Sequence, residues 1–267
     1  AMSFSSLFNK RDFICFQVGD PIESFKVSNK KYKIKSFFEA LFFLPLSFLP
    51  KKILFCSKDI YEFYKKNFSY LIKNLDYLPL TIDTKLFVPK DKKTARKKLG
   101  LPINKEIILY VGRIEYMKGS DISLELIKNN PNKIFVLIGE INDNHFKNLN
   151  LQNLIHLNSK KHEELVDYYN SADLCIFPSR IESFGFVPRE AMSCGLPTLV
   201  SDIKSLRTLE SAIKSKLNYE SMNNEIKKFF EISEKQKKKI SLESRKFIIK
   251  EYSEENLKKE FINKLFN

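Results

Sequence analysis

The middle of the chain alternates short, continuously apolar runs with stretches of helical periodicity. The runs occupy residues 107–111, 134–138, 154–157, 174–177 and 197–200. Helical patterns lie between some of them, over 162–171 and 188–194. Because each run is apolar at every position rather than at every second one, we expect strands that are covered on both faces. Strands alternating with helices predict a doubly wound parallel α/β sheet.

The first part of the chain repeats this order less completely. Three short runs, at 13–18, 53–56 and 77–80, predict strands, with helices expected over 31–49 and 58–67. We therefore expect a second, incomplete sheet in this part of the chain.

A polar stretch with a proline, residues 81–93, predicts the linker between the two parts. Apolar residues recur at helical spacing over 256–266, which predicts a terminal helix. The expected domains are a partial Rossmann-like domain over 1–88, a second Rossmann-like domain over 89–250, and a terminal helix over 251–267 that packs back towards the first domain.

Positive charge is concentrated in the first part. The whole chain of 267 residues carries a net charge of +14. Residues 1–100 hold 20 Lys and Arg against 9 Asp and Glu, a balance of +11, whereas the remainder holds 26 against 23, a balance of +3. A basic region of this kind predicts an anionic partner. The absence of a recognised nucleic-acid motif argues against nucleic acid.

An apolar, Phe-rich segment at 36–50 lies between lysines, within a basic region over 30–52. It is too short to span a bilayer, which needs about 20 apolar residues. Two interpretations stay open: a core helix, or a helix that lies on an anionic membrane surface. No secretory signal is visible at the start, so we expect a cytoplasmic protein, with a peripheral position on the inner face of a membrane under the second interpretation.

Several classes of cofactor site are missing from the sequence. The seven glycines never form G-x-G, so the dinucleotide fingerprint and the P-loop are absent. No D-x-D pair occurs, and the four cysteines are far apart without a C-x-x-C pair. We therefore expect no metal, no cofactor and no disulfide framework.

The first segment with candidate functional residues follows the run at 107–111. Gly112 allows a tight turn, and Arg113 and Lys118 follow on the loop that leads to a helix. This loop leaves the carboxyl end of a strand, which is where ligands bind in open α/β sheets. A planar guanidinium and a point charge together suit a diphosphate.

The second segment follows the run at 174–177. Glu182 and Glu190 are eight positions apart, and Gly185 lies between them just before a helix. A glycine lets backbone N–H groups approach an anion, and the helix N-terminus adds positive partial charge. Glu190 has two carboxylate oxygens that can accept hydrogen bonds from a vicinal diol such as a ribose.

These segments resemble the retaining GT-B glycosyltransferases of group 1 (family 4). Glu182 and Glu190 match the E-x7-E signature of that family, and the resemblance covers about residues 76–267. It rests on four stretches in family order, namely the interdomain stretch 81–89, the phosphate loop 111–119, the donor block 172–197 and the terminal helix.

The resemblance implies two Rossmann-like sheets that face a cleft, and a nucleotide-diphosphate sugar as donor. Arg113 and Lys118 would neutralise the diphosphate, and Glu190 would hold the ribose. Glu182 would hold the sugar hydroxyls and the pyrophosphate, together with the backbone from Ser183 to Phe186. Retention in the family is ascribed to front-face attack, in which the leaving phosphate helps to deprotonate the acceptor. The implied catalytic residues are Glu182, Arg113 and Lys118, and the implied donor-binding residues are Gly112, Arg113, Lys118, Glu182, Ser183, Phe184, Gly185, Phe186 and Glu190.

The sequence departs from the family pattern in its first part and after residue 202. Only about 80 residues precede the linker, no histidine occurs before His145, and a Lys- and Ser-rich stretch at 203–218 replaces a glycine-rich one. His145, His156 and His162 are predicted to be surface or edge residues. The main hypothesis is sugar transfer to a glycan or lipid-linked acceptor in envelope assembly. The alternative is a non-catalytic or partner-dependent donor-binding subunit, with a second chain supplying the missing elements.

Overall fold

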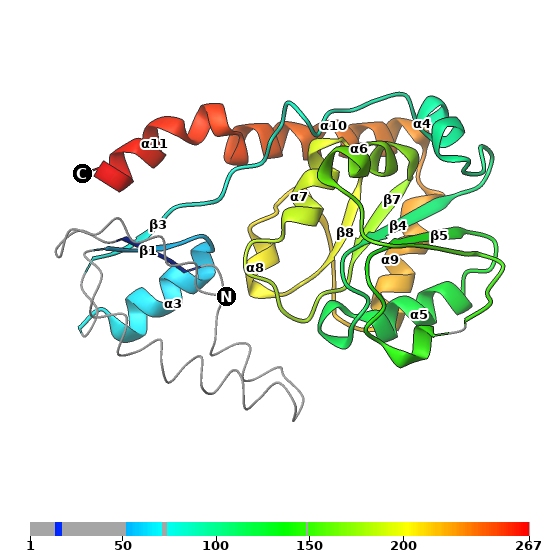
Figure 1. Ribbon diagram of the computed structural model, residues 1–267, viewed down its shortest axis with the longest axis horizontal. Coiled ribbons are helices and arrows are strands. Elements are labelled where there is room, and N and C mark those ends of the chain that lie inside the picture. The colour runs from blue at the N-terminus through cyan, green and yellow to red at the C-terminus, as the bar shows by residue number, and fades with distance from the viewer. Residues whose placement is uncertain (1–13, 18–51, 71–73, 148, 267) are drawn as a thin grey trace. The chain divides into compact units, whose positions relative to one another are not determined.

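The structure is a computed structural model that describes residues 14–17, 52–70, 74–147 and 149–266 (Figure 1). Its contacts divide the chain into two units. Unit 1 comprises Ala1–Thr81, Ile181–Gly185 and Leu257–Asn267, and unit 2 comprises Ile82–Arg180 and Phe186–Asn256. The first division, between Thr81 and Ile82, falls inside the predicted linker, and each unit is described by itself below.

Unit 1 contains a three-stranded parallel sheet in the order β1 (Ile14–Gln17), β2 (Lys52–Phe55) and β3 (Leu75–Tyr77). The helix α3 (Lys58–Phe68) connects the last two strands, and its Tyr64 ring stacks on Phe55 with a centroid distance of 5.1 Å. The three predicted strands are present, with the third beginning two residues earlier than expected. The predicted helix at 31–49 and the apolar segment at 36–50 lie outside the described residues.

The terminal helix α11 (Glu254–Phe266) contributes its later turns to unit 1. Lys264 forms an ion pair with Asp76 at 3.1 Å and donates a hydrogen bond to the carbonyl of Tyr77. Lys52 donates in turn to the carbonyl of Lys264 at 3.0 Å. One lysine near the end of the chain therefore ties α11 to the last strand of the small sheet.

Unit 2 is built on a six-stranded sheet in the order β6-β5-β4-β7-β8-β9, and every pair of neighbouring strands is parallel. The strands are β4 (Ile107–Val111), β5 (Ile134–Ile138), β6 (Leu154–Leu157), β7 (Leu174–Phe177), β8 (Thr198–Ser201) and β9 (Ile213–Ser215). The prediction of an α/β fold with parallel sheets is confirmed. Predicted and observed bounds agree residue for residue in the first four of these strands.

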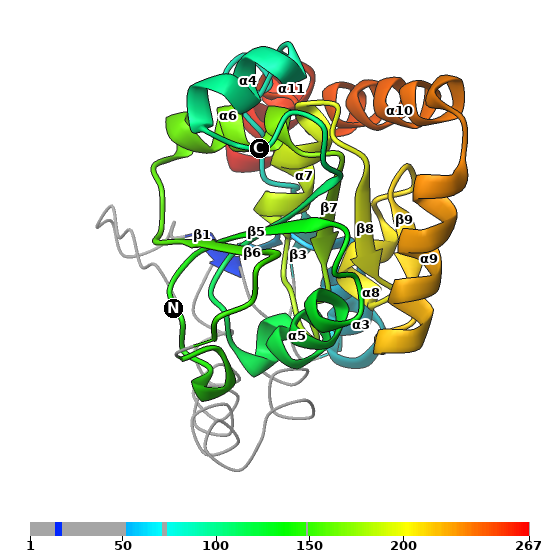
Figure 2. The ribbon, with the colours of Figure 1, turned by 90° about the vertical axis from the view of Figure 1, so that its right-hand side faces the viewer.

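Helices cover both faces of this sheet (Figure 2). They are α4 (Lys92–Leu99), α5 (Ser120–Lys128), α6 (His162–Ser171), α7 (Phe186–Ser193), α8 (Lys204–Arg207), α9 (Tyr219–Glu231) and α10 (Glu234–Tyr252), with short 3-10 turns at Tyr116–Lys118 and Asn144–Phe146. The helix α6 has the predicted bounds, and α7 begins two residues before the predicted start.

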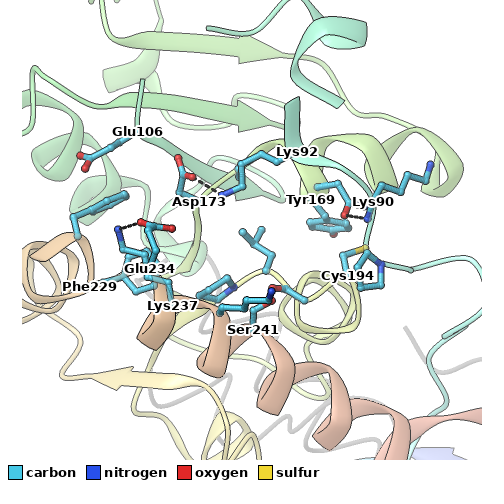
Figure 3. A pocket seen from close by; sticks show the side chains of 18 of the residues that line it. Lys90, Lys92, Glu106, Tyr169, Asp173, Cys194, Phe229, Glu234, Lys237 and Ser241 are labelled. Atoms are coloured by element: carbon cyan, nitrogen blue, oxygen red, sulfur yellow. Dashed lines mark hydrogen bonds and ion pairs between the residues drawn. The ribbon is translucent and has the colours of Figure 1, made fainter. Parts of the chain in front are cut away.

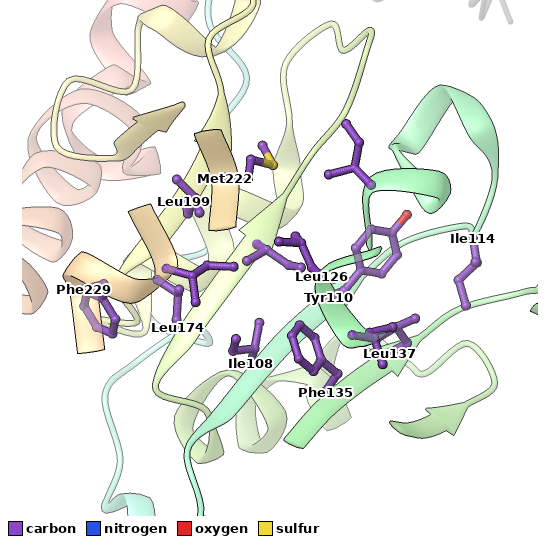
Figure 4. Packing of buried hydrophobic residues seen from close by; sticks show 14 of the residues in the cluster. Ile108, Tyr110, Ile114, Leu126, Phe135, Leu137, Leu174, Leu199, Met222 and Phe229 are labelled. Atoms are coloured by element: carbon purple, nitrogen blue, oxygen red, sulfur yellow. The ribbon is translucent and has the colours of Figure 1, made fainter. Parts of the chain in front are cut away.

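The core of unit 2 lies between the sheet and the pair α5 and α9 (Figure 4). Leu126 of α5 and Met222 and Phe229 of α9 are buried against sheet residues such as Ile108 and Phe135. Burying one such side chain contributes about 1.5–3 kcal/mol. The strands are apolar at every position because α5 and α9 cover one face of the sheet and other helices of unit 2 cover the opposite face.

Some elements of unit 2 form where the sequence analysis predicted a linker or a loop. The helix α4 begins at Lys92, inside the stretch predicted as a linker, with Asp91 accepting the amide of Thr94 at 2.8 Å as its N-cap. The strand β9 forms within 203–218, the Lys- and Ser-rich stretch for which no strand was predicted. Within the described part of the chain, no helix is long and apolar enough to cross a membrane.

Candidate active site

The topological switch point of unit 2 lies between β4 and β7. From β4 the chain builds outward through β5 and β6 on one side, and from β7 through β8 and β9 on the other. The loops that leave the carboxyl ends of β4 and β7 therefore turn in opposite directions, which is the arrangement expected to form a crevice in an open α/β sheet. Ligands of open α/β sheets bind at such a point.

The turn after β4 depends on glycine. Gly112 has a φ of 138° and donates its amide to the carbonyl of Ile138 at 2.9 Å. The turn after β5 lies against it, because a Cβ on Gly139, with a φ of 150°, would lie 2.0 Å from the Gly112 oxygen. A side chain at Gly139 would therefore displace the beginning of the loop that carries Arg113.

Arg113 and Lys118 both lie on this loop, as predicted from their positions after the strand. The Arg113 side chain is 60% exposed and has Glu115 as an ion-pair partner at 3.0 Å, and the buried Tyr110 donates its hydroxyl to the Arg113 carbonyl at 2.7 Å. Lys118 places its ammonium 5.8 Å from the centre of the Phe177 ring at the end of β7. The loop thus holds two cations at the switch point, directly before the N-terminus of α5.

The loop after β7 is fastened to the loop after β4. A Cβ on Gly119 would lie only 2.1 Å from the carbonyl oxygen of Pro178. Arg180 donates its amide to the Met117 carbonyl at 3.0 Å, and its guanidinium pairs with Asp121 at 2.6 Å and stacks 3.7 Å above the Tyr116 ring. These contacts fix the loop after β7 against the loop after β4.

Glu190 lies in the middle of α7 and is only 3% exposed. Tyr169 of α6 donates its hydroxyl to Glu190 Oε2 at 2.8 Å, and His162 Nδ1 lies 3.8 Å from Oε1, beyond hydrogen-bond distance. Burial raises the pKa of the Glu190 carboxyl above its usual value, and the Tyr169 hydrogen bond opposes that shift. Tyr169 was not identified from the sequence, because nothing in its own segment marks which residue of another helix it contacts.

The predicted residues from Glu182 to Gly185 belong to unit 1, whereas Phe186 begins α7 in unit 2. Glu182 accepts the amide of Ser183 at 3.0 Å. Phe184 is buried and Phe186 is 44% exposed. The roles of Glu182 and its neighbours towards a donor stay predictions.

Ser179 is a second residue that the sequence analysis missed. It follows β7 directly and is fully buried, and its hydroxyl has no hydrogen-bond partner among the described residues. A buried hydroxyl without a partner costs about 1–3 kcal/mol. The only sequence signal for it is its position two residues after a strand at the switch point.

The histidines lie at the surface, and the described cysteines are buried. His145, His156 and His162 are exposed, which confirms their prediction as surface or edge residues. Across the residues that the structure describes, no three His, Cys, Asp or Glu side chains are grouped to hold a metal ion. Burial raises the pKa of the Cys175 and Cys194 thiols to about 12, which keeps both unreactive.

The opposite, amino-terminal edge of the sheet contains a cavity of about 560 Å³ (Figure 3). It is bounded by the residues that precede β4, β7 and β8 and by one side of α10. Its charged groups are largely paired with one another, with Lys92 on Asp173 at 2.6 Å and Lys237 on Glu234 at 2.8 Å. At the carboxyl edge, Arg113 also has a carboxylate partner, but its side chain is 60% exposed.

The residues at the switch point lie within a segment that matches a recognised sequence family. The profile of the family described as glycosyl transferases group 1 matches residues 91–247, which is more than half of the chain. The chain belongs to this family.

A curated group 1 relative is the D-inositol 3-phosphate glycosyltransferase of Xylanimonas cellulosilytica. It is 29% identical over 155 residues, which are 52% of this chain and 37% of that protein. The matched segment therefore spans little more than a third of the relative's own length.

Two solved structures share the GT-B type of fold. Sucrose-phosphate synthase from Thermosynechococcus elongatus has a TM-score of 0.80 at 20% identity, covering 95% of this chain and 67% of that one. HepE from Anabaena, in complex with UDP and glucose, has a TM-score of 0.76 at 16% identity, covering 96% and 71%. At these identities the likeness establishes the fold, and it confirms the predicted fold class.

Proposed function

We propose that this group 1 protein transfers a sugar, with retention, from a nucleoside-diphosphate sugar to a glycan or lipid-linked acceptor, without a metal. The observation that carries the proposal is the pair Arg113 and Lys118 on the loop at the switch point, before the N-terminus of α5. A diphosphate needs cations and backbone donors at one place, and this loop provides both. The HepE structure, which has the same fold, contains UDP and glucose.

In this proposal, the two cations act on the leaving group. Negative charge grows on the β-phosphate as the sugar–oxygen bond breaks, and a guanidinium and an ammonium fixed in advance stabilise that charge without reorganising. Because the Tyr110 hydroxyl and the Gly112 amide hold the loop backbone at 2.7 and 2.9 Å, the cations are positioned before the donor arrives.

Glu190 is proposed to hold the ribose. Its Oε2 accepts from Tyr169, and its Oε1 has no hydrogen bond to His162, which lies 3.8 Å away. A ribose hydroxyl that donates to Oε1 would satisfy a buried acceptor. Glu182 and the backbone of residues 183–186 are proposed to hold the sugar, in accordance with the E-x7-E signature.

The proposal for the acceptor rests on other observations than the proposal for the donor. The curated relative is named for D-inositol 3-phosphate, but the match covers only 37% of that protein. We therefore take the basic character of the chain, rather than that name, as support for an acceptor at an envelope membrane. A cytoplasmic, membrane-peripheral location fits such an acceptor.

The test is nucleotide binding by Arg113→Met, measured as the shift of thermal unfolding with UDP, GDP and ADP. A ligand at 100 times its Kd adds about 2.7 kcal/mol to the free energy of unfolding. We expect one nucleotide to shift the unmodified chain and to have almost no effect on Arg113→Met. Lys228→Met is the matched control, since Lys228 is also 60% exposed with Glu225 as its carboxylate partner, but lies on α9.

Equal nucleotide shifts in both variants would remove Arg113 from the donor site. The same proteins, incubated with the sugar nucleotide of the responding base, test turnover. Binding without hydrolysis or transfer would favour the alternative of a partner-dependent donor-binding subunit.

A further inference from the structure

The outward side of α10 has an unusual composition. Seven residues follow one another at intervals of one, three or four positions, so they share one side of the helix, and all seven are exposed. These seven contain no acidic side chain, although Glu243, which is also exposed, lies at the margin of the same side of the helix. We call them the α10 face, which consists of Lys235, Lys238, Lys239, Leu242, Lys246, Ile249 and Lys250.

The opposite side of α10 fixes this orientation. Ser244, Ile248 and Tyr252 are buried, and Arg245 donates to the carbonyl of Phe87 at 3.0 Å. Ser241 donates its hydroxyl to the carbonyl of Gly195. Because these contacts prevent the helix from rotating about its axis, most of the α10 face points away from the core of unit 2, and Lys238 lies at its edge, where it also lines the cavity at the amino-terminal edge of the sheet.

Much of the charge on the α10 face is uncompensated. Lys239 and Lys250 have acidic neighbours on the same helix, at 3.8 Å from Glu243 and 2.9 Å from Glu251. Within the described part of the chain, Lys235, Lys238 and Lys246 have no carboxylate partner. The face therefore presents three unpaired ammonium groups over about three turns of helix.

The two apolar residues of the α10 face lie among these lysines. Leu242 is 53% and Ile249 is 37% exposed, and seven positions, or about two turns, separate them. Two large aliphatic side chains on the same side of a helix, surrounded by lysines, are typical of a helix that lies in a lipid interface. Lysine stems extend upward to the headgroups while the aliphatic side chains enter the acyl boundary.

The composition also distinguishes between anionic partners. Nucleic acids are contacted mainly through Arg, Lys and stacking aromatic rings, and they offer little to Leu and Ile. The α10 face has neither Arg nor an aromatic ring. An anionic lipid surface, in contrast, uses both kinds of side chain that the face provides.

We infer that the α10 face lies on an anionic membrane surface, with Lys235, Lys238 and Lys246 on lipid phosphates and Leu242 and Ile249 in the acyl boundary. This surface belongs to unit 2 and is separate from the segment at 36–50. It is also separate from the switch point, so its test is independent of the test of donor binding.

The experiment is co-sedimentation of the full chain with vesicles of phosphatidylcholine alone or mixed with phosphatidylglycerol. Binding is expected only with phosphatidylglycerol and is expected to weaken with salt. Lys235→Gln/Lys238→Gln/Lys246→Gln should reduce the affinity by roughly a hundredfold, since each lysine near an anionic surface contributes about fivefold. Leu242→Ser/Ile249→Ser should reduce it by at least about tenfold, because it removes most of the inserted apolar surface.

The matched control is Lys128→Gln/Lys147→Gln/Lys227→Gln, which removes the same charge from exposed positions of unit 2 outside α10. This variant should bind vesicles like the unmodified chain. Equal losses in the control and in the α10 lysine variant would overturn the inference, because net charge alone would then explain binding. Unchanged binding of Leu242→Ser/Ile249→Ser would also overturn it, in favour of a general polyanion site. Circular dichroism and the nucleotide shift of each variant verify that the fold is intact.

Discussion

Two arginines at opposite edges of the same sheet are used in opposite ways. Arg96, at the amino-terminal edge, has a side chain that is only 5% exposed, and it donates to the carbonyls of Ser171, Ile103 and Lys105 at 2.7–2.9 Å. Arg113, at the carboxyl edge, is 60% exposed. Arg96 therefore helps to close the fold, whereas Arg113 remains accessible to solvent.

Asp173 links three parts of the amino-terminal edge of the sheet through one carboxylate. Its carboxylate accepts from Arg96 at 2.7 Å and from the amide of Ile107 at 2.8 Å, and it pairs with Lys92 at 2.6 Å. The start of β4, the residue before β7 and the helix α4 therefore meet on one carboxylate. A buried charged group of this kind is tolerated only when all of its hydrogen bonds are made.

The largest effect is expected from Arg96→Met. It removes a buried guanidinium and leaves Asp173 and several carbonyls without their donor, so the free energy of unfolding should fall by about 3–5 kcal/mol. Arg113→Met should change it by less than about 1 kcal/mol, because its ion pair is largely in solvent. Urea denaturation of the two variants measures the difference. Similar stabilities would contradict the assignment of the two edges.

The next largest effect on stability is expected from alanine substitutions at two glycines with similar backbone angles. Gly119 has a φ of 75° and its added Cβ would meet the Pro178 oxygen at 2.1 Å, whereas Gly100 has a φ of 67° and nothing within 4 Å. Gly100→Ala should cost about 1–2 kcal/mol, for the left-handed conformation alone. Gly119→Ala should cost several kcal/mol and should also weaken nucleotide binding, because the loop must move away from β7. If the thermal midpoints of the two variants coincide, the contact between the loops does not restrain the crevice.

The smallest effect is in the pH dependence of stability, where two carboxyls should act with opposite sign. Hydrogen bonds from Lys90 and Lys98 hold the pKa of Asp167 below its usual value, so its stabilising contribution is complete above about pH 4 and is lost as the pH falls through the folded-state pKa. Burial raises the pKa of Glu190, so stability is highest below the unfolded pKa of about 4.3 and declines as the pH rises through the raised value.

Unfolding midpoints of Asp167→Asn and Glu190→Gln, measured from about pH 3 to pH 8, separate these contributions. Asp167→Asn should flatten the acid side of the profile, and Glu190→Gln should flatten the decline with rising pH. A profile of Glu190→Gln parallel to that of the unmodified chain would contradict this, because it would mean that the carboxyl has the same pKa in the folded and unfolded states.

The parts that sequence predicts well are those where one physical requirement dominates. Residues 107–111 and 134–138 are recognisable because a strand covered on both faces must be apolar at every position. The strand β9 was missed because Ile213–Ser215 is a three-residue edge strand with a lysine at its centre. The helix α4 was missed because, apart from Ala95 and Leu99, its residues are polar or charged, and its main anchor is a buried arginine.

The candidate site divides in the same manner. Gly112, Arg113 and Lys118 follow from their position after a strand, since a carboxyl-end loop is where a parallel sheet binds ligands. Tyr169 and Ser179 do not, because their importance depends on which groups of other elements face them. A partner that is distant in the sequence leaves no local pattern, whereas strand and turn positions do.

The junction beside Ile82 has a consequence for the architecture of unit 2. Ile82 donates its amide to the carbonyl of Tyr252 at 2.8 Å and forms a parallel bridge with Ser253. The chain therefore enters unit 2 and leaves it at neighbouring points, held together by the backbone. A module whose two ends touch can be transplanted into a surface loop of another protein without stretching its host, and its own ends can be joined and reopened elsewhere by circular permutation.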